Sequence, residues 1–232
     1  MRRFWHETQI MRVAEGFEVA LDGKPIRTPG KAALVLPNMA VAEAMRDEWD
    51  AQASDVDPRA MPVTRAANTA IDRVVPNAVA VVGEITAFGE TDLLCYREPK
   101  PAALAARQAE GWDPLLDWAA GRYGARLTPS NGVMFSAQDG GAVAALHDAV
   151  AGFDAWRLTA LHELVTLTGS LVLGLAIAER RLAAAEGWRL SRIDEDWNIE
   201  EWGKDAEAAA AAAVRERALY DAARLMALLE DE

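Results

Sequence analysis

Apolar and polar positions alternate along the first third of the chain with the two-residue period of β-strands. Phe17, Val19 and Leu21 fall on one face of such a strand. Asp22-Gly23 favours a hairpin turn, because both residues tolerate a positive φ. Short runs with this character lie between turn residues at 10–13, 17–21, 25–28 and 33–36. Together they predict a small antiparallel sheet.

The period then changes to that of α-helices. Asn38 can cap a helix over 39–52, and the apolar side of this helix would cover one face of the sheet. Trp49 lies on that side, so we expect it to point inward and to be structural. A second helical pattern begins near Thr64 and stops at Pro76, where the ring should end the helix.

The rest of the chain is mainly helical in pattern. Residues 136–139 match a capping box for the helix that contains 143–150, and an apolar helix over 154–178 can be capped by its first residue. Further helical patterns cover 79–88, 104–122, 182–190 and 205–229. The expected fold is α+β: a small antiparallel-sheet domain with a covering helix at 1–80, then a mainly α-helical domain at 81–232.

Composition narrows the class of protein. The 232 residues carry 24 basic and 36 acidic side chains, a net charge of −12, which argues against nucleic acid and anionic membranes as partners. The longest uncharged stretch, 164–178, is shorter than the roughly 20 residues that span a bilayer, so we predict no membrane insertion. The single cysteine, Cys95, fits a reducing compartment, and no targeting segment is visible at the start. We therefore expect a cytoplasmic protein.

Motifs for catalysis, cofactors and metals are missing. The glycine pair at Gly169 and Gly174 lacks the lysine of a phosphate loop, so close packing of a core helix explains it better. Ser170 between them reads as mid-helix rather than as an exposed nucleophile. The three histidines lie far apart and lack metal-ligand spacing: His6, His147 and His162. We predict no cofactor, no metal and no catalytic residue.

The sequence is instead notable for its tryptophans and for a cluster of acidic residues. There are eight tryptophans, and the stretch 194–207 holds seven acids against one base. The negative charges of these acids repel one another unless a basic group pairs with them. Tryptophan beside such charge is typical of a protein-binding patch. The candidate binding residues are Asp194, Glu195, Asp196, Trp197, Glu200 and Trp202. The alternative is a solvated charged face with Trp197 and Trp202 as core anchors.

The order of several motifs resembles that of the ATP synthase F1 complex assembly factor 2 family, chaperones that hold the unassembled alpha subunit of the ATP synthase head. The matching segments run from end to end: Arg3-Phe4-Trp5, Leu21-Asp22-Gly23-Lys24-Pro25-Ile26-Arg27-Thr28-Pro29, Glu48-Trp49-Asp50-Ala51-Gln52, Met61-Pro62-Val63-Thr64-Arg65 with Asn68, Thr91-Asp92-Leu93-Leu94-Cys95-Tyr96-Arg97, Trp112-Asp113-Pro114-Leu115, Thr168-Gly169-Ser170 and Asp194-Glu195-Asp196-Trp197 with Trp202-Gly203.

The resemblance implies the same two-domain α+β fold, no cofactor and no catalysis. It implies binding of a newly made alpha subunit until the beta subunit replaces the chaperone, with the critical acid at Asp194 or Glu195. We expect a monomer, cytoplasmic in a bacterium, with eukaryotic relatives in the mitochondrial matrix. Two other readings stay open: a hydrolase-type enzyme with carboxylates in a cleft between the domains, and an acidic adaptor for another basic protein.

Overall fold

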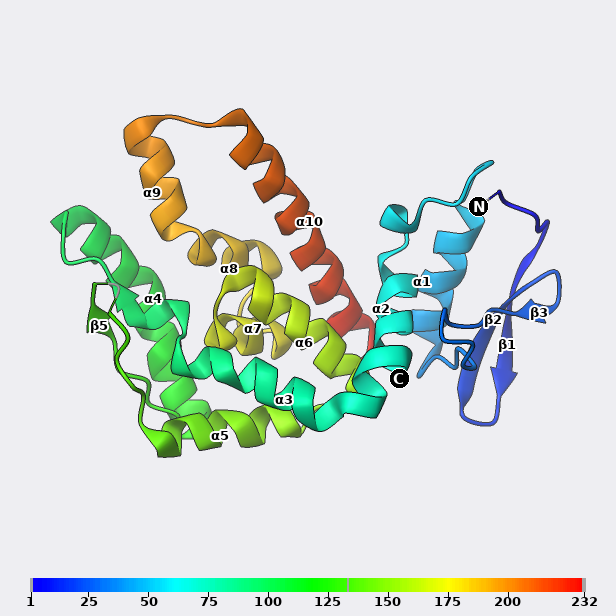
Figure 1. Ribbon diagram of the computed structural model, residues 1–232, viewed down its shortest axis with the longest axis horizontal. Coiled ribbons are helices and arrows are strands. Elements are labelled where there is room, and N and C mark those ends of the chain that lie inside the picture. The colour runs from blue at the N-terminus through cyan, green and yellow to red at the C-terminus, as the bar shows by residue number, and fades with distance from the viewer. Residues whose placement is uncertain (1, 133, 231–232) are drawn as a thin grey trace. The chain divides into compact units, whose positions relative to one another are not determined.

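The computed structural model describes residues 2–132 and 134–230, and Figure 1 shows its helices and strands. The chain forms two compact units. Unit 1 comprises Met1–Ala78, Asp154–Ala160 and Arg224–Glu232, and unit 2 comprises Val79–Phe153 and Leu161–Ala223. The α+β class is confirmed, with one small antiparallel sheet near the start and a mainly helical remainder. The division into domains at residue 80 stays a prediction.

The sheet of unit 1 has the order β1-β2-β3, and both pairings are antiparallel. Its strands are Thr8–Val13, Gly16–Leu21 and Lys24–Pro25. Asp22 and Gly23 adopt φ values of 48° and 77° in the predicted hairpin turn. The predicted run at 33–36 forms isolated bridges rather than a strand, because it pairs only through Ala33 with Arg27 and Leu36 with Phe17.

Helix α1, Met39–Asp50, packs on β1 and β2 as the sequence predicted. Asn38 caps it, since its side chain accepts a hydrogen bond from Val41 N at 2.9 Å. Trp49 points inward and meets the ring of Trp5 edge-on, with the centroids 5.1 Å apart. The apolar face of α1 therefore belongs to the core of unit 1. Figure 1 shows this helix beside the strands of the sheet.

The second predicted helix does not stop at Pro76. Helix α2, Pro62–Thr69, continues through a π-helical segment, Ala70–Val74, into α3, Val75–Glu90, which kinks at Asn77. The side-chain amide of Asn77 donates a 2.8 Å hydrogen bond to Arg73 O, which satisfies a carbonyl at the kink. The wide π turn and this side-chain bond let the helix pass the proline ring.

Unit 2 is built around α7, whose eight residues are all buried. The two-residue strands β4 and β5 pair in parallel. A Cβ on Gly174 would overlap the side chain of Val165, so the expected close packing is confirmed at Gly174. It is wrong for Gly169, which lies in a left-handed turn and has no atom closer than 3.9 Å to the position of a Cβ. The remaining elements are β4 Tyr96–Arg97, α4 Ala102–Tyr123, β5 Ser130–Asn131, α5 Gly140–Ala151, α6 Ala155–Thr168, α7 Leu171–Ala178, α8 Ala184–Ser191, α9 Ile193–Trp202 and α10 Ala206–Leu228.

Two helix starts differ from the prediction. The apolar pattern over 154–178 is two helices, because Gly169 takes a left-handed φ of 71° and Ser170 then caps α7 by accepting from Leu173 N. Ser170 is thus a helix cap and not a mid-helix residue. The cap of α5 is Asp139 rather than Ser136, with Asp139 Oδ1 2.9 Å from Ala142 N.

The long last helix is confirmed, with Asp205 Oδ1 accepting a cap hydrogen bond of 2.7 Å from Ala208 N. Among the described residues, none of the helices has the combined length and apolar character needed to cross a bilayer.

Candidate functional site

The acidic cluster singled out in the sequence forms a helix of its own. Residues 193–202 are α9, which follows α8 after a break at Arg192. Three acids, Asp194 to Asp196, lie in its first turn, where the helix dipole favours negative charge by roughly 0.3–1 kcal/mol each. The mutual repulsion of the acids is therefore offset in part by their place in the helix.

One side of α9 is fixed to α4 through Arg107. Both terminal nitrogens of Arg107 donate to the carboxylate of Glu200, each at 2.8 Å, and this pairing lowers the pKa of Glu200. The same guanidinium lies 5.0 Å from the ring centroid of Trp197, within the range of a cation–π contact. A single arginine thus holds two of the predicted residues from outside their own helix.

A buried amide fixes the start of α9 to the same helix. Gln108, fully buried, donates from Nε2 to Asp194 Oδ1 at 2.6 Å and accepts from Glu98 N at 2.9 Å. The helices approach closely here, because a Cβ on Gly111 would lie 2.8 Å from Leu190 Cδ2 and 3.0 Å from Ile193 Cδ1. Asp194 therefore has an internal hydrogen-bonding role.

The opposite side of α9, here the α9 outer face, is exposed. It comprises Glu195, Ile199 and Trp202, spaced four and three residues apart and therefore on one side of the helix. The exposed fractions of Ile199 and Trp202 are 37% and 86%. Within the described chain, Glu195 has no ion pair or hydrogen bond through its carboxylate.

The structure thus separates the six predicted residues into three groups. Asp194, Trp197 and Glu200 contact α4, and Asp196 lies 3.6 Å from Arg192, one turn back on its own helix segment. Glu195 and Trp202 lie on the outer face. Ile199 is absent from the predicted residues, although its spacing from Glu195 and Trp202 along a helix is a signal in the sequence. The partners on α4 are absent from the prediction as well.

Comparison with known proteins shows the family to which the chain belongs. The model of the ATP12 chaperone protein family matches residues 2–120. The crystal structure of Atp12 from Paracoccus denitrificans is 48% identical, with a TM-score of 0.96, and the match covers 99% of this chain and 98% of that one. The chain belongs to the ATP12 chaperone family. It is an assembly chaperone of ATP synthase, and the resemblance found in the sequence is confirmed.

Two further structures agree with this assignment. An aspartate-to-lysine mutant of Paracoccus denitrificans Atp12p is 47% identical with a TM-score of 0.96, covering 99% of this chain and 98% of that one. A candidate chaperone from Agrobacterium tumefaciens is 44% identical with a TM-score of 0.95, covering 99% of this chain and 86% of that one. The α+β fold of this ATP12-family chain is therefore the fold of its relatives.

Two buried reactive groups in this ATP12-family chain have structural roles. Asp92, fully buried, accepts from Leu94 N and Val172 N, each at 3.0 Å, and joins the start of α7 to the segment before β4. Burial raises the pKa of Asp92 to about 6. Burial, together with the nearby Asp92 charge, raises the pKa of the Cys95 thiol to about 12, so this thiol is a poor nucleophile.

Metal binding finds no support in the described part of the chain, where no three histidine, cysteine or acidic side chains gather as an ion would require. The carboxylates of α9 are spread along and around one helix rather than gathered at a common point. Chemically, this arrangement offers apolar area flanked by negative charge, which suits the docking of another protein.

Proposed function

We propose that this ATP12-family chain binds the unassembled F1 alpha subunit through the α9 outer face and keeps it from aggregating until the beta subunit takes its place. The observation that carries the proposal is the exposure of the Trp202 indole, which is 86% exposed. Trp202 is the last residue of α9, and α4 contacts this helix on its other side. Tryptophan is enriched among the residues that contribute most to binding at protein interfaces, and here it stands beside a second exposed apolar side chain, Ile199, on the same side of the helix.

The chemistry of the outer face suits a client that must later be released. A lone subunit of a ring exposes the partly apolar surface that its neighbour would cover, and such a surface aggregates in water. Trp202 and Ile199 offer apolar contact area to it. Glu195 adds negative charge, which accelerates association and makes the complex weaker at high salt.

The six predicted residues divide between contact and support in this proposal. Glu195 and Trp202 touch the client, together with Ile199. Asp194, Trp197 and Glu200 position the helix, because each is engaged by α4 through Gln108 or Arg107. Asp196, paired with Arg192, stands at the edge of the surface. The chain works as a monomer in the bacterial cytoplasm, where the alpha subunit is made.

Capture of purified alpha subunit on immobilised chaperone tests the proposal. Trp202→Ala and Glu195→Gln should each reduce capture, with the larger loss for the tryptophan. Val79→Ala is the matched control, because Val79 is 89% exposed and lies away from α9 in sequence and on another helix. Equal capture by wild type, Trp202→Ala and the control, with all three folded, would remove the outer face from the function.

A further inference from the structure

A hollow in unit 1 lies where the loop after β3 meets the π-helical segment Ala70–Val74. Its volume is about 630 Å³, within the range of roughly 300–1,000 Å³ that is common for ligand sites. We propose that this hollow is a second client site, in which the side-chain amide of Asn68 pairs with a backbone peptide group of an extended client segment. This inference rests on the proposed function, since it takes the alpha subunit as the client.

The walls of the hollow are fixed to each other by one carboxylate. Asp72, in the π-helical segment, accepts from Thr28 Oγ1 at 2.7 Å and from Gly30 N at 2.9 Å, with one carboxylate oxygen for each. The approach is close, because a Cβ on Gly30 would lie 2.7 Å from Asp72 Oδ1. Thr28 Oγ1 also accepts from Ala32 N at 3.1 Å. The loop is therefore tied to the helix, and the hollow is formed before any ligand binds.

The side-chain amide of Asn68 lines this hollow without a hydrogen bond. Its Oδ1 is buried, and neither Oδ1 nor Nδ2 bonds to any residue that the structure describes. A buried polar atom is rarely left unpaired, because it has lost its water and gained no partner. Since no hydrogen bond holds the amide in place, it can turn its two ends toward a ligand. A ligand that offers a donor and an acceptor side by side would satisfy both.

The charges of the lining favour an uncharged polar ligand. The hollow has two charged residues in its lining, Asp72 and Arg73, and their charges sum to zero. A phosphate group would meet the carboxylate of Asp72, and a metal ion would meet the guanidinium of Arg73, so neither is favoured. An asparagine amide, in contrast, can accept from the N–H of a peptide group and donate to a C=O of the same chain. The ligand chemistry that fits is that of a peptide group.

A polypeptide supplies this chemistry together with apolar side chains. Peptide N–H and C=O groups recur along an extended chain, and side chains stand beside them. Ile71, half-buried, and Pro29, exposed, offer apolar area next to the amide. The chain belongs to a family of assembly chaperones, which act on other polypeptides. The client of this chaperone is therefore the occupant that the hollow fits.

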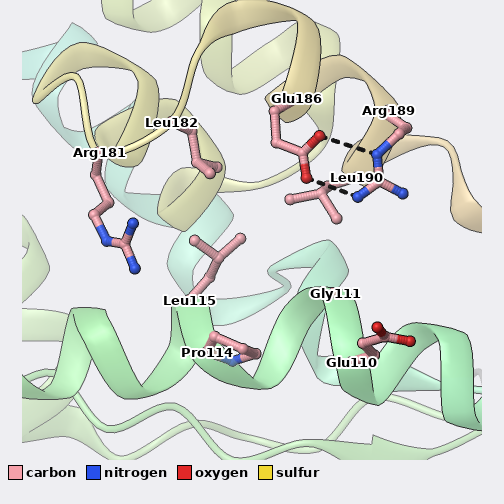
Figure 2. A pocket seen from close by; sticks show the side chains of 9 residues that line it. All are labelled: Glu110, Gly111, Pro114, Leu115, Arg181, Leu182, Glu186, Arg189 and Leu190. Atoms are coloured by element: carbon pink, nitrogen blue, oxygen red, sulfur yellow. Dashed lines mark hydrogen bonds and ion pairs between the residues drawn. The ribbon is translucent and has the colours of Figure 1, made fainter.

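The groove between α4 and α8 in unit 2 differs in its polar groups (Figure 2). The described residues that line it include no asparagine or glutamine. Two of its charged side chains, Glu186 and Arg189, already bond to each other at 3.0 Å and 2.7 Å. The unpaired amide thus distinguishes the hollow in unit 1.

Binding and stability of a single variant test this inference together. Asn68→Ala removes an amide that no hydrogen bond of the fold uses, so urea unfolding should give a stability equal to or above that of wild type. Its affinity for purified alpha subunit should fall roughly tenfold, as expected for the loss of one or two hydrogen bonds. Asn131→Ala, at an exposed asparagine of β5 in unit 2, is the matched control and should bind and unfold as wild type does.

Crosslinking and a synthetic peptide identify the occupant. A photoreactive side chain at position 69, where the exposed Thr69 lines the hollow, should crosslink to the alpha subunit. A peptide of the crosslinked segment should compete with the alpha subunit for the wild-type chaperone. Methylation of one backbone nitrogen of this peptide should weaken the competition, and the same methylation should have no effect with Asn68→Ala.

The outcomes separate this inference from the proposed function. If Asn68→Ala binds as wild type does while Trp202→Ala loses the client, the hollow is not a client site and the α9 outer face stands. A lower stability of Asn68→Ala would show that the amide supports the fold instead. A crosslink from position 69 to a second copy of the chain, or competition that no single methylation weakens, would also overturn the inference. If wild-type chaperone captures no alpha subunit, both proposals fall.

Discussion

The side-chain amide of Gln108 donates a 2.6 Å hydrogen bond to Asp194 across the contact between α4 and α9. Gln108 is fully buried, and its carbonyl oxygen is already used by Glu98 N. Asp194 is therefore the partner that satisfies a buried donor, whereas its neighbour Glu195 points outward. Of the two acids that the sequence left as equal candidates, we assign support to Asp194 and client contact to Glu195.

Replacing each acid by leucine separates these roles. Asp194→Leu leaves the buried Nε2 of Gln108 without an acceptor and should lower the free energy of unfolding by about 1–3 kcal/mol. Glu195→Leu should change it by less than about 0.5 kcal/mol, as is usual for an exposed position. Urea unfolding followed by circular dichroism gives both values. Equal losses in the two variants would show that the hydrogen bond does not stabilise α9.

The buried carboxyl of Asp92 should make stability depend on pH. Its pKa is about 6 in the folded protein and about 3.8 in the unfolded chain, so the folded state holds more protons between these values. The contribution of Asp92 to the free energy of unfolding therefore falls as the pH rises from about 4 to about 6, and it stays low above that.

Asp92→Asn removes this titration and serves as the reference. The stability of wild type relative to Asp92→Asn should fall by about 2–3 kcal/mol between pH 4 and pH 7. Urea unfolding at four pH values measures the difference, in which the titrations of the other acids cancel. A difference that stays constant across this range would mean that the Asp92 pKa is not raised.

Trp49 should be needed for the fold rather than for binding. It is 9% exposed and packs edge-on against Trp5, so Trp49→Arg both removes a buried ring and places a charge in the core of unit 1. We expect a loss of about 3–5 kcal/mol and a clearly lower melting temperature by circular dichroism. Trp202→Arg is the matched control and should melt as wild type does, because that ring is in water. A Trp49→Arg melt equal to wild type would contradict this account.

The sequence predicted those parts of the fold that are set by residues close together in the chain, such as helix caps and hairpin turns. Asn38 and Asp154 cap helices as expected, since a capping side chain bonds to a backbone N–H two or three residues later. The hairpin at Asp22-Gly23 is equally local. The predicted helix end at Pro76 is wrong, because the helix continues past the proline ring through a π-helical segment that no local sequence pattern predicts.

The support of the candidate site could not be predicted from local signals. Arg107 and Glu200 are 93 residues apart in the sequence, and Gln108 and Asp194 are 86 apart. The acids of 194–200 looked like a self-repelling cluster because their partners come from α4. Composition was enough to identify the acidic cluster and Trp202. Which residues of the cluster face water depends on how α9 packs against α4.

Hydrogen–deuterium exchange on the purified chain, with and without the alpha subunit, tests the central claim most directly. The account predicts that adding the alpha subunit slows exchange in 195–202 and that adding the beta subunit instead leaves this segment unchanged. Unaltered exchange in 195–202 on addition of the alpha subunit, with slowing confined to other parts of the chain, would contradict it.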